Sequence, residues 1–185
     1  MIIKTGRFGE LRVEKSEEIL IPNGLLGFPE DRRFCIVDPG DDTLILWLQS
    51  LDNPDVVFPI LEPKVFRTDF KVTLSGADQR ELGLTKLDTG SVFCVLTIPE
   101  DVTQMTANLK APLVIHRDLQ IAKQVVLQEN EYSIKHLMFK ELKAHLITIQ
   151  STMANVARAS AEDKQPTSVP IQNLPVSREL RSLTS

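Results

Sequence analysis

The feature that most constrains the fold is a regular series of short runs, rich in β-branched and aromatic residues, across the first 140 residues. Turn-forming sequences such as PNG at 22–24, PG at 39–40 and DNP at 52–54 separate the runs. Because no helix-length segment lies between successive runs, an antiparallel sandwich or barrel is favoured over a parallel sheet. The predicted strands are residues 2–5, 9–13, 18–21, 34–38, 44–49, 56–61, 69–74, 91–98, 113–117 and 122–128.

One short helix is predicted within this region. Ser75 is a suitable N-cap, and Asp78 follows three residues later, as in a capping box. Gly83 is placed to end the helix. The first 140 residues are therefore expected to form a mostly-β, small antiparallel β-barrel-like domain with one short helix.

The composition changes after residue 140. Apolar residues then recur every three or four positions, at Leu142, Leu146, Ile149, Met153 and Val156. This spacing predicts an amphipathic helix over residues 141–161, which could pack on the β domain, self-associate or capture a helical partner. Residues 162–185 contain three prolines and many polar side chains, which favours a flexible tail.

Charge is distributed unevenly between these parts. The chain carries 21 basic and 25 acidic side chains, and residues 1–140 account for a net charge of −5. This balance provides no basic surface for phosphates, so direct binding of nucleic acid is not expected. An acidic domain favours a basic partner instead.

The sequence contains no recognisable catalytic or metal-binding motif. Cys35 and Cys94 lie in separate apolar runs and are expected to be buried, reduced thiols. The three histidines are at least nine residues apart and match no metal-ligand spacing. We therefore expect no enzyme activity, no cofactor and no metal site.

Targeting segments are also lacking in the sequence. No apolar run is long enough for a signal peptide or a membrane-spanning helix. A cytoplasmic protein without membrane attachment is the expectation.

Several segments combine apolar anchors with uncharged polar groups. The first, IPNGLLGF at 21–28, could either plug one end of a barrel or present apolar side chains to a partner. In the second, LWLQS at 46–50, Trp47 is expected to be a core anchor. Polar residues of these segments, and acidic residues in turns, make up the candidate partner-binding set: Gln49, Ser50, Asp52, Asp55, Glu100, Asp101, Asn108, Lys110, Pro112 and Gln124.

Taken together, these segments resemble the FliW family of flagellar assembly factors. The matching pieces are FGEL, IPNGLLGF, WLQS followed by DNPDVVFPI, TANLKAPLVIH and AKQVVLQENEYSIKH, which span about residues 2–137. The resemblance implies a β-barrel-like, non-catalytic protein that binds flagellin in the cytoplasm before export. It also implies binding to the RNA-binding translational repressor CsrA, which is released when flagellin accumulates.

The resemblance assigns no role to the region after residue 140. We expect a monomer, and two other interpretations of the whole chain stay open. One is a small enzyme with a scattered active site, and the other is a structural subunit held in a larger assembly by the helix at 141–161.

Overall fold

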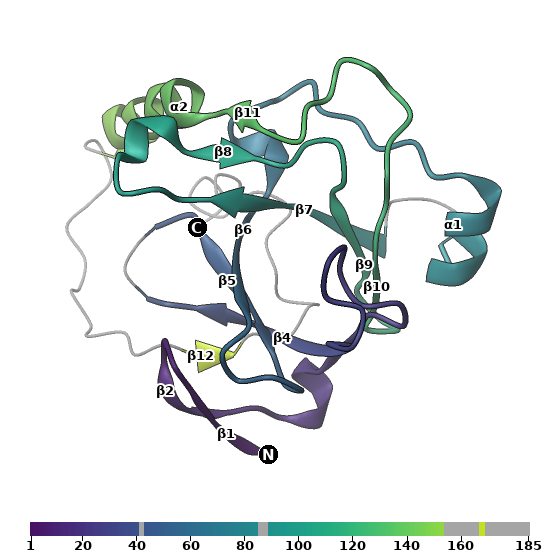
Figure 1. The fold of residues 1–185 in the computed structure, drawn as a ribbon. Helices are drawn as coiled ribbons and strands as arrows, with labels where there is room; N and C mark the ends of the chain where they lie inside the picture. The colour runs from purple at the N-terminus through teal and green to yellow at the C-terminus, as the bar shows by residue number, and fades with distance from the viewer. Residues whose placement is uncertain (41–42, 85–88, 154–166, 169–185) are drawn as a thin grey trace.

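Seven strands close into a barrel in the structure, a computed structural model that describes residues 1–40, 43–84, 89–153 and 167–168 (Figure 1). Around the barrel the order is β7 (Gly90–Thr97), β6 (Val57–Leu61), β5 (Leu46–Ser50), β4 (Arg33–Asp38), β3 (Ile19–Leu20), β10 (Ile121–Gln124) and β9 (Leu113–His116), which pairs with β7. All neighbours are antiparallel except β3 and β10. The predicted mostly-β, barrel-like fold is confirmed.

Smaller elements surround the barrel. A hairpin of β1 (Ile2–Thr5) and β2 (Gly9–Arg12) lies on one side, and β8 (Thr106–Ala107) and β11 (His136–Leu137) extend the sheet beyond β7. The remaining elements are the α-helices α1 (Gly76–Leu82) and α2 (Phe139–Met153), the 3-10 helices η1 (Lys15–Glu17), η2 (Pro63–Val65) and η4 (Val102–Gln104), and the strand β12 (Thr167–Ser168). No helix in the described part of the chain is long and apolar enough to cross a membrane.

Apolar side chains form three clusters, one inside the barrel and two on its outer wall. The interior cluster contains Phe34, Leu48, Ile60 and Ile115, among others. A second cluster lies beneath α1, β8 and α2, and the third lies beneath the β1–β2 hairpin. Both cysteines are buried free thiols, as predicted.

Trp47 is not the core anchor that the sequence suggested. Side chains alternate along β5, so Leu46 and Leu48 enter the barrel and Trp47 faces the outer wall. There it is only half-buried, covered by the hairpin. The Arg7 guanidinium carbon lies 3.5 Å from its ring centroid, and Phe8 packs edge-on at 6.1 Å.

The predicted helix α1 is confirmed, with both of its caps. The Ser75 hydroxyl accepts a hydrogen bond from the Asp78 N–H, and the Asp78 carboxylate accepts one from the Ser75 N–H. Gly83 ends the helix with a φ of 67°. All of these interactions lie within nine residues of sequence, which is why the pattern alone specifies them.

The predicted strand at 69–74 is wrong. Its side chains do alternate between more buried and exposed, but none of the strands in the described part of the chain pairs with this segment. Instead, the Lys71 N–H donates to the Tyr132 hydroxyl, and Phe70 packs against the Tyr132 ring with centroids 4.7 Å apart. Alternation here reflects packing on the outer wall without a ladder of hydrogen bonds.

The chain from α2 onward, which we call the appendage, is attached to the barrel at two places. Helix α2 begins at Phe139, and its Leu142 is buried in the second cluster, whereas Leu146 is exposed. Residues 154–161 of the predicted helix lie outside the described residues, as does most of the predicted tail. Within that tail, Thr167–Ser168 pair with β4 as strand β12, which the sequence pattern did not predict.

Candidate partner-binding surface

Residues 21–32 connect β3 to β4, and we call this segment the strap. Ile21 and Leu25 are buried in the cluster inside the barrel. A tight turn at Gly24, whose φ is 63° and whose N–H donates to the Ile21 carbonyl, returns the chain to the surface. Leu26 and Phe28 are then 62% and 38% exposed. The strap therefore both plugs the barrel and presents two large apolar side chains to solvent.

Gln124 of β10 anchors the first half of the strap. Its Oε1 accepts a hydrogen bond from the Leu26 N–H at 2.9 Å, and its Nε2 donates to the Ala111 carbonyl at 3.0 Å. The Asn108 side chain in turn accepts from the Ala111 N–H at 3.0 Å. One side chain thus links the strap to the turn that precedes β9.

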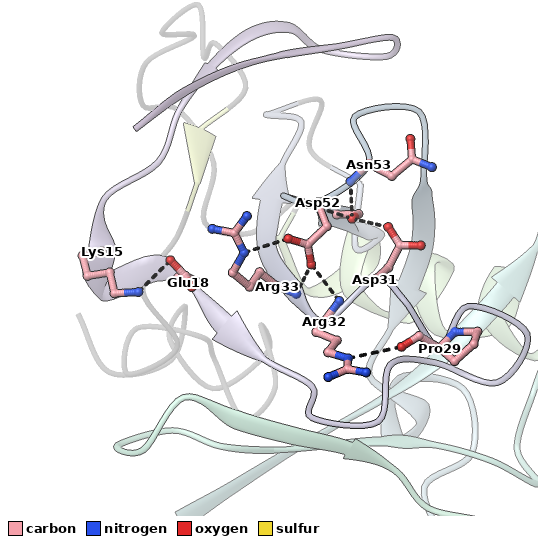
Figure 2. A network of polar contacts seen from close by, with 9 residues as sticks. Lys15, Glu18, Pro29, Asp31, Arg32, Arg33, Asp52 and Asn53 are labelled. Atoms are coloured by element: carbon pink, nitrogen blue, oxygen red, sulfur yellow. Dashed lines mark hydrogen bonds and ion pairs between the residues drawn. The ribbon is translucent and has the colours of Figure 1, made fainter.

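Asp52 anchors the second half of the strap, from the turn between β5 and β6 (Figure 2). Its Oδ2 accepts hydrogen bonds from the Arg32 and Arg33 N–H groups, both at 2.8 Å. Its Oδ1 pairs with the Arg33 guanidinium at 2.7 Å. Beside it, the Ser50 hydroxyl donates to the buried Asp31 carboxylate at 2.7 Å.

The electrostatics of Asp52 follow from these contacts. Burial by itself raises the pKa of Asp52, but the hydrogen bonds from the two backbone amides and the Arg33 guanidinium outweigh it and hold this pKa below its usual value. At neutral pH Asp52 is ionised and paired. Its charge is therefore largely balanced within the molecule, by Arg33 and the two backbone N–H groups, and is less able to pair with a binding partner.

Gln49 and Ser50 are the last two residues of β5, where the same turn begins. Both are fully buried, and the Gln49 Nε2 donates to the carbonyls of Ser50, Pro54 and Val56. The Ser50 hydroxyl also accepts from the Asp52 and Asn53 N–H groups. In the structure these side chains shape the turn, and direct contact with a partner stays a prediction for both.

A cavity of about 240 Å³ lies next to the strap. It is lined by strap residues 21–26, residues 121–124 of β10 and Glu81 of α1. Lys123 bridges Asp78 and Glu81 on its wall, at 2.8 and 2.7 Å. Phe28 packs edge-on against Phe58 of β6, with ring centroids 4.9 Å apart. The strap, its two exposed apolar side chains and this cavity form the candidate partner-binding surface.

The other predicted site residues lie at varying distances from this surface. Lys110 Nζ donates to the Glu129 carbonyl, and Pro112 is buried. Asp55 is exposed in the same turn as Asp52. Glu100 and Asp101 lie in the turn that joins β7 to η4. The structure therefore joins Gln124, Asp52 and Ser50 directly to the strap by hydrogen bonds, and it joins Asn108 to the strap through Ala111 and Gln124.

Sequence reasoning missed the strap residues Asp31 and Arg32 and the first residue of β4, Arg33. They belong to no motif, and what marks them is their hydrogen bonding to a turn some 20 residues away. Their partners, Ser50 and Asp52, are in the predicted set.

The two thiols are not ionised, and no metal site is assembled in the described residues. Burial raises the pKa of the Cys35 thiol to about 12 and raises that of Cys94 as well, so both stay protonated at neutral pH. No group of three or more metal-ligating side chains gathers within residues 1–40, 43–84, 89–153 and 167–168.

Replacing Ser50 by alanine is expected to destabilise the protein by about 2–3 kcal/mol, because the change leaves a buried carboxylate oxygen and two backbone N–H groups without their partner. Ser133→Ala is the matched control. That serine is exposed, and its hydroxyl accepts one hydrogen bond, from the Lys135 N–H, so loss of the hydroxyl should cost about 0.5 kcal/mol or less. Urea unfolding measures both. Equal effects would show that the Ser50 network does not hold the turn.

Comparisons with known proteins agree with this fold. The family model described as FliW protein matches residues 2–138. The flagellar assembly factor FliW of Bdellovibrio bacteriovorus is 40% identical over 147 residues, covering 80% of this chain and 84% of the relative. That of Geobacter sulfurreducens is 34% identical over 141 residues, covering 76% and 88%.

A solved structure is also similar. The crystal structure of a flagellar assembly factor FliW superposes with a TM-score of 0.71 and 27% identity, covering 75% of this chain and 97% of that chain. The region that the family model matches, residues 2–138, contains the barrel and the strap, and the resemblance noted from the sequence is confirmed. The chain belongs to the FliW family of flagellar assembly factors.

Proposed function

We propose that this chain is a non-enzymatic, cytoplasmic protein that chaperones flagellin before export and antagonises the translational repressor CsrA. Family membership supports the flagellar role. The observation that carries the binding role is the strap, which presents Leu26 and Phe28 to solvent from a backbone anchored by side chains of β10 and the β5–β6 turn. Exposed apolar side chains held in a fixed place are typical of protein-binding surfaces.

The strap surface suits an amphipathic helix such as a terminus of flagellin. Such a helix would lay its apolar face on Leu26 and Phe28 and place one side chain in the neighbouring cavity of about 240 Å³. The polar groups of Glu81 and Lys123 at the cavity wall would then contact the polar flank of the helix.

For CsrA, the supporting feature is the net charge of −5 on residues 1–140. An RNA-binding repressor is expected to be basic, so charge complementarity would speed and orient the encounter. Among the acidic residues proposed as contacts, Asp55, Glu100 and Asp101 are exposed and Asp52 is paired with Arg33. The first three are therefore the better candidates for direct contacts.

Association with CsrA is expected to weaken at least about tenfold between 0.1 and 1 M salt, because the Debye length falls from about 10 Å to about 3 Å over that range. Flagellin binding through apolar side chains should change much less. Titrations with each purified partner at both salt concentrations measure the two effects. A salt-independent affinity for CsrA would remove charge from the proposal.

Size-exclusion chromatography with mass detection tests whether the two complexes form at all. The free protein should elute with the mass of one chain, and each partner should shift it to a complex. Failure to bind either partner would contradict the proposed function. A mass of two chains for the free protein would instead favour self-association through α2, whose Leu146 and Ile147 are exposed.

A further inference from the structure

One edge of strand β4 is only partly paired by the other strands of the barrel. Its neighbour β3 is two residues long and pairs only with Arg33 and Phe34, at the start of β4. The last residues of β4, through Asp38, continue past the end of β3, and on the other side β4 stays paired with β5 as far as Val37. An unpaired strand edge exposes backbone N–H and C=O groups that readily accept an additional strand.

The chain's own C-terminal segment occupies this edge. Thr167 lies opposite Asp38, and Ser168 lies opposite Val37, in an antiparallel pairing. Strand β12 also contacts β2 of the hairpin, so it lies in a slot between β2 and β4 (Figure 1). The slot adjoins the cluster beneath the hairpin, which contains Leu11, Val13 and Val37.

The sequence around β12 suits a short added strand. The segment reads PTSVP, in which β-branched residues lie between Pro166 and Pro170. β-branched residues favour strands, whereas proline cannot donate to a ladder and is confined to edge strands or their ends. The segment can therefore pair with an exposed strand edge, while its flanking prolines disfavour the pairing of a further strand onto its own outer edge.

We propose that the slot between β2 and β4 is a strand-addition site whose resting occupant is the chain's own segment at 167–168. The appendage is then attached to the barrel at two places: Leu142 of α2 packs in the second cluster, and β12 pairs with β4. Because the occupant is tethered, it is present at a high effective concentration and excludes extended peptides added from outside. This strand-addition site is separate from the strap surface, and the proposal does not rest on the function proposed above.

A variant with the substitutions Thr167→Pro and Ser168→Pro in the full chain tests the proposal. The control is Ser182→Pro with Thr184→Pro, which makes the same two exchanges elsewhere in the tail. Hydrogen exchange followed by mass spectrometry should show faster exchange at the end of β4 in the first variant only. Thermal unfolding of both variants shows that the barrel is retained.

A fluorescent peptide with the sequence KQPTSVPI, residues 164–171, provides the second measurement. It should bind the Thr167→Pro/Ser168→Pro variant at least about tenfold more tightly than the wild type or the control, because the tethered occupant no longer competes. Equal binding to all three proteins, binding to none, or unchanged exchange at the end of β4 would overturn the proposal.

Discussion

Replacing Gly24 by alanine is expected to destabilise the protein by at least about 3 kcal/mol, because a side chain at this position both strains the backbone and collides with it. The φ of Gly24 is 63°, a region that alanine adopts only at a cost. An added Cβ would lie 2.2 Å from the Phe28 carbonyl oxygen and 2.8 Å from the Pro29 Cα. Both contacts are with backbone, which can move only if the strap changes its path.

Gly27→Ala is the matched control in the same strap. Its φ is 88°, but an added Cβ meets no atom within 4 Å, so only the backbone strain of about 1–2 kcal/mol applies. Guanidinium chloride unfolding of the two variants separates the collision from the strain. Equal destabilisation would show that the close packing of the strap on itself contributes nothing to stability.

The second large effect is on binding. Substituting Leu26 and Phe28 together by serine is expected to weaken flagellin binding at least about 30-fold, since residues central to an interface cost about 2 kcal/mol or more when truncated. Stability should fall by no more than about 1 kcal/mol, mainly through the lost edge-on contact of Phe28 with Phe58. Calorimetric titration and thermal unfolding give the two quantities.

The control for this variant is the substitution of Ile98 and Ile134 by serine. Their exposed fractions, 38% and 64%, match those of Phe28 and Leu26, and neither belongs to the strap or lines its cavity. Flagellin binding should be unchanged in the control. Equal losses in both variants, or no loss in either, would show that the strap is not the docking surface.

Local patterns in the sequence predicted what depends on local geometry. The caps of α1 depend on Ser75, Asp78 and Gly83, which lie within nine residues, and each has its predicted role. Most barrel strands were located because alternation and turn residues are also local. By contrast, β8 and β11 are two residues long, and no periodicity marks them because β8 depends on its pairing with β7 and β11 on its pairing with β8.

The errors arose where a distant segment decides the outcome. The segment at 69–74 has the alternation of a strand, but no strand among the described residues pairs with it. Trp47 has the bulk of a core residue but lies on the outer face of β5. Which strap residues turn inward depends likewise on the barrel around them. The partner of the Leu26 N–H, Gln124, is 98 residues away, so its anchoring role could not be read from spacing.

The most direct test of the proposed partner switch is an exchange experiment. Fluorescently labelled CsrA is bound to the protein, and purified flagellin is added while the anisotropy of the label is followed. Anisotropy should fall to that of free CsrA as flagellin reaches saturation, and the Leu26→Ser/Phe28→Ser variant should need at least about 30-fold more flagellin for the same release. An anisotropy that stays constant or rises as flagellin saturates the wild-type protein, which indicates that both partners are bound together, would contradict the proposal.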